Sequence, residues 1–111
     1  MSSYYFAFGS NMNKERMIER EVEFNEIEMQ KGFLKDWKLV FNKISRQLKD
    51  VGFANIVPEN NSFVEGVIYE VNETTIDVLD RYEGSPQEYH KKIMPVETSN
   101  NKSVNCIVYI A

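Results

Sequence analysis

The sequence predicts an α+β domain built on a strongly curved sheet or a small barrel. Strand-like segments fill the middle and the end of the chain, and several of them alternate apolar and polar side chains with the period of a half-buried strand. Helical patterns are confined to one clear segment at residues 74–82 and a short one near the start. The chain lacks the regular alternation of strand and helix that a doubly wound sheet requires, so that fold class is excluded.

The first strand and the turn after it form the most distinctive stretch of the sequence. Residues 5–8, YFAF, are an apolar, aromatic run that is typical of a buried strand. The run stops at residues 9–11, GSN, where the backbone can turn sharply. Residues 13–18 then have helical character, with Asn11 or Asn13 as the N-cap. A strand, a glycine turn and a helix N-terminus can together hold an anion. A tight strand-to-helix turn without a ligand is equally consistent with this pattern.

The remaining strands follow from alternation and from turn residues. The predicted segments cover residues 33–41, 51–57, 66–71, 89–96 and 104–110. In the first of them, the face expected to be half-buried consists of Trp37, Leu39 and Phe41. We expect a polar loop at 43–50, a strand end at Pro58 and a turn at 59–62. Gly66, inside a strand, indicates a bulge or a close approach of another backbone segment.

The clear helical segment has recognisable signals at both ends. Thr74 can cap its N-terminus, and Asp77, three residues later, completes the pattern of a capping box. Its apolar face is expected to consist of Ile76, Leu79 and Tyr82. Gly84 and Pro86 should end the helix.

Composition and charge exclude several classes of function. The chain has 111 residues, of which 42% are hydrophobic and 27% charged, as expected of one globular domain rather than a disordered segment. Its formal net charge of −4 argues against nucleic-acid binding, which needs clustered Lys and Arg. No apolar run reaches membrane-spanning length, and the first residues lack the basic-then-apolar layout expected of a secretion signal. Cys106 is the only cysteine, which is typical of a reducing compartment. We therefore expect a cytoplasmic protein without nucleic-acid or membrane partners.

Glu83 is the strongest candidate for chemistry. It follows Tyr82 in the last turn of the predicted helix or just beyond it, where the negative end of the helix dipole raises the pKa of a carboxyl group. Burial against Leu79, Tyr82 and Tyr89 would raise that pKa further. A carboxyl group that titrates near neutrality can accept and return a proton, as general acid–base catalysis requires. The structural alternative is an incidental surface glutamate, which costs on the order of a few tenths of a kcal/mol.

Other catalytic patterns fit the sequence less well. Ser10 and His90 do not indicate a hydrolase, because the motif Gly-x-Ser-x-Gly is absent. Cys106 lies on an alternating apolar strand and is expected to be a core thiol. Zinc-ligand spacing and phosphate-binding glycine loops are also absent, so we expect no metal and no cofactor. The pair Lys91-Lys92 is expected to be a solvated charged patch.

Two blocks of the sequence, taken together, resemble a known family. Residues 5–12, YFAFGSNM, resemble the Tyr-Gly-Ser-Asn signature of the γ-glutamylcyclotransferase superfamily, which includes the AIG2-like proteins. Residues 66–71, GVIYEV, followed by residues 79–84, LDRYEG, are similar to the second block of that family. The similarity extends in register from Tyr4 to the end of the chain. Phe8 departs from the pattern, since the family usually has Tyr at that position.

The resemblance implies a fold, a reaction and a set of site residues. The fold is a small mixed β-barrel with one or two flanking helices. The reaction cyclises a γ-glutamyl group to 5-oxoproline and releases a free amine or amino acid. Glu83 matches the position of the family's catalytic acid/base, and Asn11 would support the substrate-binding loop. That loop matches Tyr5, Phe6, Ala7, Phe8, Gly9 and Ser10. Tyr89 is our candidate for the further substrate-contacting tyrosine that longer members have beyond the last strand.

The residue types suit this chemistry. The substrate's own α-amine is the nucleophile, so the reaction needs neither a Ser or Cys nucleophile nor a metal or cofactor. One carboxyl group of raised pKa can take a proton from the attacking amine and give one to the leaving amine. N–H groups of the loop can hold the substrate carboxylate and the charge that develops on the attacked carbonyl.

We expect one γ-glutamylcyclotransferase-like domain over residues 1–111, with a C-terminal segment that is short or missing relative to longer cyclotransferases. The leading hypothesis is an enzyme whose partner is a small-molecule γ-glutamyl substrate, and a homodimer is kept open. The alternative is a non-catalytic small-molecule-binding domain that retains the pocket. A third hypothesis is an interaction domain whose last strand pairs with a partner. The family resembled here divides by substrate into γ-glutamyl amino acids, glutathione, γ-glutamyl amines and a protecting group on an aminoglycoside, and the sequence does not distinguish among them.

Overall fold

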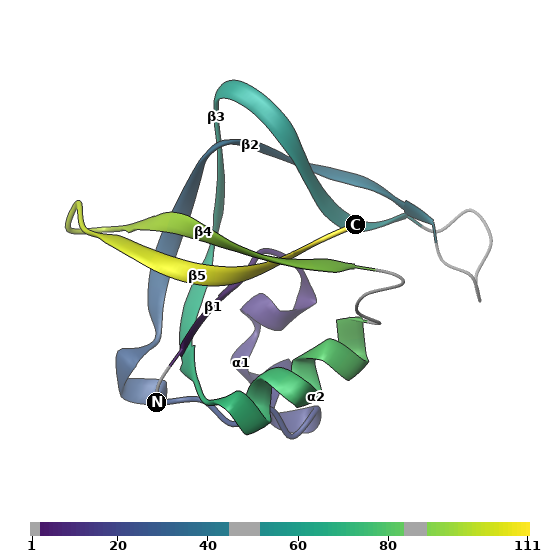
Figure 1. Cartoon of the computed structure of the whole chain (residues 1–111), viewed down its shortest axis with the longest axis vertical. Coiled ribbons are helices and arrows are strands. Elements are labelled where there is room, and N and C mark those ends of the chain that lie inside the picture. The colour runs from purple at the N-terminus through teal and green to yellow at the C-terminus, as the bar shows by residue number, and fades with distance from the viewer. Residues whose placement is uncertain (1–2, 45–51, 84–88) are drawn as a thin grey trace.

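The computed structural model describes residues 3–44, 52–83 and 89–111, whose strands form a closed barrel (Figure 1). The strands are β1 (Ser3–Ala7), β2 (Gln30–Ile44), β3 (Gly52–Val71), β4 (His90–Thr98) and β5 (Ser103–Ile110). The helical elements are η1 (Ser10–Met12), α1 (Lys14–Glu19), η2 (Glu26–Glu28) and α2 (Glu73–Glu83). Around the barrel the order is β1-β3-β2-β4-β5, with antiparallel neighbours except for the parallel pair β1 and β5. The predicted α+β fold, a small mixed barrel with flanking helices, is confirmed.

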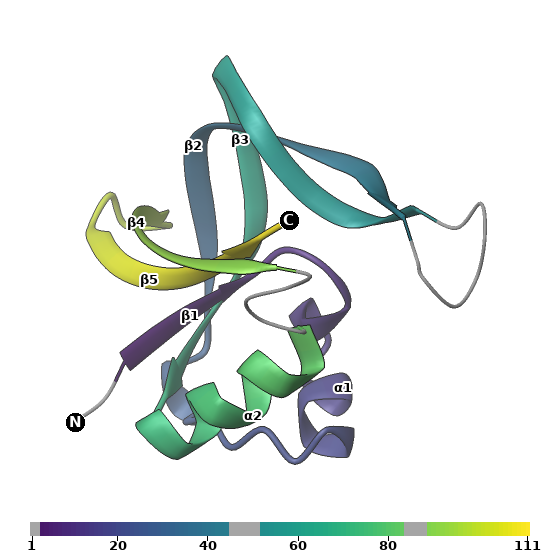
Figure 2. The ribbon, with the colours of Figure 1, turned by 45° about the vertical axis from the view of Figure 1, so that its right-hand side comes forward.

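β1 separates two apolar clusters because its side chains alternate between its two faces. Phe6 and Phe8 belong to the cluster inside the barrel. Tyr5 and Ala7 belong to a second cluster, which includes side chains of α1 and α2. Both helices lie together on one side of the barrel (Figures 1 and 2). The helices therefore cover the side of β1 from which Tyr5 projects.

The hairpin of β2 and β3 differs from the prediction at its bend. β3 does not end at Pro58 but continues through residues 59–62, so the predicted turn there is wrong. Residues 59–62 instead form an irregularity in the pairing of β3 with β2, and Asp36 lies at the register shift on β2. The Asn61 N–H donates a hydrogen bond to Asp36 Oδ1 (3.2 Å). Asp36 and Asn61 have positive φ angles of 66° and 67°, which Asp and Asn tolerate better than most residues.

The outer part of this hairpin projects from the barrel (Figures 1 and 2). Leu39 and Phe41, expected on a half-buried face, are 39% and 68% exposed, so that part of the prediction is wrong. The alternation identified the strand correctly, but it did not show how much of this face other elements would cover. On β3, by contrast, Ile56 is buried and contributes to the barrel core.

Both N-caps of the α-helices are asparagines. Asn13 caps α1, because its Oδ1 accepts a hydrogen bond from the Glu15 N–H (2.9 Å). Asn72 caps α2, because its Oδ1 accepts from both the N–H (2.9 Å) and the hydroxyl (3.0 Å) of Thr75. The prediction of Thr74 as that cap is wrong, since the helix begins one residue earlier, at Glu73.

The rest of α2 partly follows the predicted pattern. Leu79 is buried and Ile76 packs against the second apolar cluster, whereas Tyr82 is 53% exposed. The predicted helix end at Gly84 and Pro86 lies outside the described residues, as does most of the predicted loop at 43–50. The two late strands are confirmed as β4 and β5. Within the described ranges, no helix is long and apolar enough to cross a membrane.

Candidate active site

Glu83 is the last residue of α2 and is half-buried. Burial raises the pKa of its carboxyl group from 4.5 to about 7, because the charged form loses hydration. The positive charge of Arg20 acts in the opposite direction and lowers the pKa of Glu83. At neutral pH the group therefore exists in both protonation states, which is the condition for accepting and returning a proton.

The structure brings Glu83 into electrostatic range of the first strand. Burial and the Glu83 carboxylate raise the pKa of Tyr5 on β1. Burial, a hydrogen bond to Asp80 and the Glu83 carboxylate raise the pKa of Tyr109 on β5. The rings of Tyr5 and Tyr109 are in contact, edge to face, with centroids 5.9 Å apart. Glu83 thus lies close to residues that are far from it in the chain, including the first residue of the predicted loop.

The turn after β1 is held together from within. Met12 N–H donates to the Gly9 carbonyl (3.0 Å), and Asn13 N–H donates to the Ser10 carbonyl (3.2 Å), which forms η1. Ser10 is exposed and Gly9 is half-buried. The end of α2 lies beside this turn in both views (Figures 1 and 2).

Asn11 connects the turn to three other elements. Its side chain is 2% exposed, its Nδ2 donates to the Tyr5 hydroxyl (3.1 Å), and its Oδ1 accepts from Arg20 Nη1 (2.8 Å). Its backbone carbonyl accepts a hydrogen bond from the Tyr69 hydroxyl of β3 (2.6 Å). Each of these polar atoms is satisfied although it is buried. These hydrogen bonds connect the turn to β1, to β3 and to the end of α1.

The aromatic residues of the loop are oriented in opposite directions. Phe6 and Phe8 point into the barrel core, so in this structure only their backbone is available on the helix side. Tyr5 and Ala7 face the helix side. A Cβ atom at Gly66 would lie 2.3 Å from the Ala7 carbonyl oxygen, so the close backbone approach predicted for Gly66 is confirmed.

Tyr89 is half-buried and contacts Ala54, a residue that also lies beside the turn. Its hydroxyl donates a hydrogen bond to the Ala54 carbonyl of β3 (3.0 Å). A Cβ atom at Gly9 would lie 3.6 Å from Ala54 Cβ, an ordinary contact distance. Tyr89 and Gly9 therefore both adjoin Ala54.

The competing chemistries gain no support from the geometry. Cys106 is buried, as predicted, and burial raises its pKa to about 12, so its thiol is not a reactive thiolate. Among the described residues, no group of three or more His, Cys, Asp and Glu side chains could hold a metal ion. Lys91 and Lys92 are exposed, as expected. The Nζ of Lys91 also lies 2.9 Å from Asp80 Oδ2, and Tyr109 donates to the other oxygen of Asp80 (2.6 Å).

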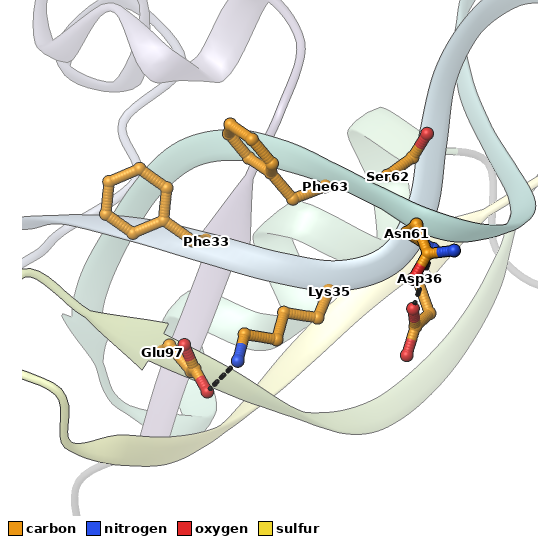
Figure 3. Close-up of a pocket in the computed structure, with 7 residues that line it drawn as sticks. All are labelled: Phe33, Lys35, Asp36, Asn61, Ser62, Phe63 and Glu97. Atoms are coloured by element: carbon orange, nitrogen blue, oxygen red, sulfur yellow. Dashed lines mark hydrogen bonds and ion pairs between the residues drawn. The ribbon is translucent and has the colours of Figure 1, made fainter.

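A separate hollow of about 430 Å³ lies on the outer surface of the barrel (Figure 3). Phe33 and Phe63 form part of its wall, with ring centroids 6.0 Å apart. Lys35 and Glu97, paired at 3.0 Å, form another part. None of the residues predicted for the site lines this hollow.

Arg20, Tyr69 and Tyr109 surround the site but were not predicted from the sequence. Arg20 is the C-cap of α1, and a basic residue at a helix C-terminus is expected there for its interaction with the helix dipole alone. Tyr69 and Tyr109 alternate with other apolar residues on strands, so each is expected to be a core residue. Only the folded barrel shows that both hydroxyls reach the helix side.

Comparisons with known proteins show the family of the chain. Residues 5–111 match the family model described as "Gamma-glutamyl cyclotransferase, AIG2-like". The chain is 29% identical over 112 residues to a γ-glutamylcyclotransferase of Bos taurus, which covers 97% of this chain and 58% of that protein. A γ-glutamylcyclotransferase of Mus musculus is 29% identical over 110 residues, covering 96% of this chain and 57% of that protein. The chain thus spans a little more than half the length of these curated relatives.

Solved structures show the same likeness. One named "Gamma-glutamyl cyclotransferase" superposes with a TM-score of 0.81 at 28% identity, covering 99% of this chain and 66% of that chain. An uncharacterised protein of Homo sapiens also gives a TM-score of 0.81 at 28% identity, with 98% and 66% covered. Because the family model matches nearly the whole chain, the protein belongs to the γ-glutamyl cyclotransferase, AIG2-like family.

Proposed function

We propose that this protein is an enzyme that cyclises a γ-glutamyl group to 5-oxoproline, with Glu83 as the general acid/base. The observation that carries the proposal is the position of Glu83: a half-buried carboxyl group with its pKa raised to about 7 by burial, in electrostatic range of Tyr5. Membership of a cyclotransferase family supports the same reaction class.

The reaction is an intramolecular acyl transfer. The α-amine nitrogen of the γ-glutamyl group attacks the γ-carbonyl carbon, which forms a C–N bond and closes a five-membered lactam ring. The original bond from that carbon to the leaving nitrogen then breaks. Glu83, in its carboxylate form, takes a proton from the attacking amine and delivers it to the leaving amine, so the enzyme ends in its starting state. No metal or cofactor takes part in this scheme.

The turn has the second role in the proposal. Backbone N–H groups of Gly9, Ser10 and Asn11 bind the substrate's α-carboxylate or the developing oxyanion. The first N–H groups of a helical turn have no partner within the turn, which suits them to this role. Because Phe6 and Phe8 point into the barrel core, their part in the loop is to fix the backbone rather than to contact the substrate with their rings.

The proposal is tested by incubating the protein with a panel of γ-glutamyl amino acids, γ-glutamyl amines and glutathione, and measuring 5-oxoproline. We expect product from at least one class, and Glu83→Gln should lower kcat by about 10²- to 10⁴-fold. Glu73→Gln is the matched control, because Glu73 is exposed at the opposite end of the same helix. It should retain full activity.

The pH profile gives a second check. Since Glu83 must be deprotonated to accept the amine proton, kcat/KM should fall as the pH drops below about 7. Absence of 5-oxoproline across the whole panel would contradict the proposal. Thermal stabilisation by a panel compound without turnover would point instead to a non-catalytic small-molecule-binding domain.

A further inference from the structure

Arg20 is held in one place by two different contacts. Its Nη1 donates a hydrogen bond to Asn11 Oδ1 at 2.8 Å. Its guanidinium carbon lies 5.0 Å from the centre of the Tyr82 ring, in a cation–π arrangement. Asn11 belongs to the turn and Tyr82 directly precedes Glu83, so one half-buried side chain bridges the two parts of the candidate site.

The bridge closes a ring of contacts. Arg20 contacts Asn11, and Asn11 contacts the Tyr5 hydroxyl (3.1 Å). Tyr5 lies within electrostatic range of Glu83, and so does Arg20. The side-chain amide of Asn11 is buried; its Nδ2 donates to Tyr5 and its Oδ1 accepts from Arg20. The orientation of the amide is therefore fixed only while Arg20 donates to Oδ1. Loss of that donor would leave a buried oxygen without its partner.

The titratable groups around Glu83 come from three neighbouring elements. Arg20 approaches it from the end of α1, Tyr5 from β1 and Tyr109 from β5. On α2 itself, Asp80 is held by Tyr109 and by Lys91 of β4. Of these groups, Arg20 is the one whose charge favours the carboxylate form of Glu83.

We infer that Arg20 is a positioning residue of the site, whose guanidinium fixes the turn through Asn11 and places a positive charge beside Glu83. Arg suits this role better than Lys, because its planar group can donate to the amide while one face lies on an aromatic ring. The effect on turnover rests on the proposed function, because it requires Glu83 to be the acid/base. The contacts of Arg20 themselves do not depend on that function.

Two variants separate the hydrogen bond from the charge. Arg20→Gln removes the charge, and we expect kcat/KM to fall by about 100-fold through misplacement of the turn. The acid limb of its pH–rate profile should also move to higher pH, since the charge that favours the carboxylate form of Glu83 is gone. Arg20→Lys keeps the charge without the planar fork, so kcat/KM should fall while the acid limb stays near that of the wild type. Arg16→Gln, an exposed position on the same helix, is the control and should change neither.

A measurement without turnover keeps this inference separate from the proposed function. The Glu83 carboxyl is titrated by NMR of carboxyl-¹³C-labelled protein, and thermal unfolding confirms that each variant is folded. The midpoint should rise in Arg20→Gln, and remain in place in Arg20→Lys and Arg16→Gln. If the wild type makes no 5-oxoproline but the midpoint moves as described, the proposed function fails and the positioning role stands. An unchanged midpoint and an unchanged kcat/KM in a folded Arg20→Gln variant would overturn the inference, even with an active wild type.

Discussion

Replacing Glu83 by Gln should make the protein more stable at alkaline pH while it removes activity. Burial raises the pKa of Glu83 from 4.5 to about 7, so the folded state binds this proton more tightly than the unfolded chain does. The stabilisation that the proton provides is fully present below pH 4.5 and is lost as the pH rises to 7. At about 1.4 kcal/mol per unit of pKa, the folded protein with ionised Glu83 is destabilised by about 3 kcal/mol.

Urea unfolding of the wild type and of Glu83→Gln at pH 4 and at pH 8 measures this destabilisation by the ionised carboxyl group. Gln resembles the protonated carboxyl group, so the two proteins should differ little at pH 4. At pH 8 the variant should be more stable by about 3 kcal/mol, since only the wild type then buries a charge. Taking the difference between the proteins at each pH cancels the titration of all other groups.

Glu73→Gln again provides the matched control: because Glu73 is exposed and keeps its hydration on folding, this variant should not become more stable than the wild type at pH 8. The reasoning would be refuted if the difference between wild type and Glu83→Gln were equal at pH 4 and pH 8. Such a result would mean that Glu83 is well hydrated in solution. A hydrated Glu83 would also remove the main support for its role as acid/base.

Two further predictions concern the fold. Gly66→Ala should lower the free energy of unfolding by about 3 kcal/mol or more, because its Cβ would lie 2.3 Å from the Ala7 carbonyl oxygen, a backbone atom that cannot move away cheaply. Gly9→Ala, with a nearest contact of 3.6 Å, should change it by less than about 0.5 kcal/mol, and equal losses in the two variants would count against this geometry. Asn72→Ala should cost about 1 kcal/mol through loss of the α2 cap, whereas Thr74→Ala should be nearly neutral in the same urea titrations. If Thr74→Ala lowered the free energy of unfolding more than Asn72→Ala did, Thr74 would be the cap after all.

Much of the fold could be predicted because the apolar periods are strong. Alternation located the strands, and the close approach at Gly66 followed from a glycine inside one of them. The run at Pro58 and residues 59–62 was misread, because its turn-forming residues are used in an irregularity within one long strand. Local preference names residues that can bend the chain, but pairing with a neighbouring strand decides whether the bend becomes a turn.

The candidate site was only partly accessible from the sequence. Glu83 could be singled out because a carboxyl group at a helix C-terminus is locally unfavourable. Arg20 could not, because a basic residue at the end of a helix has an adequate local explanation. Its contact with Asn11 depends on how the end of α1 lies against the turn, and its contact with Tyr82 depends on how α2 lies relative to α1. Such contacts between separate elements are not specified by any local pattern.

The place of β1 in the barrel also bears on how the protein is made. Its residues pair with 67–71 on one side and, through Tyr5, with Ile107 on the other. During synthesis the ribosome must therefore release the chain beyond Ile107 before the first strand has both neighbours. Pairings so distant in sequence slow folding. Until they form, the aromatic residues of this strand stay exposed on the nascent chain, where they are natural targets for chaperones.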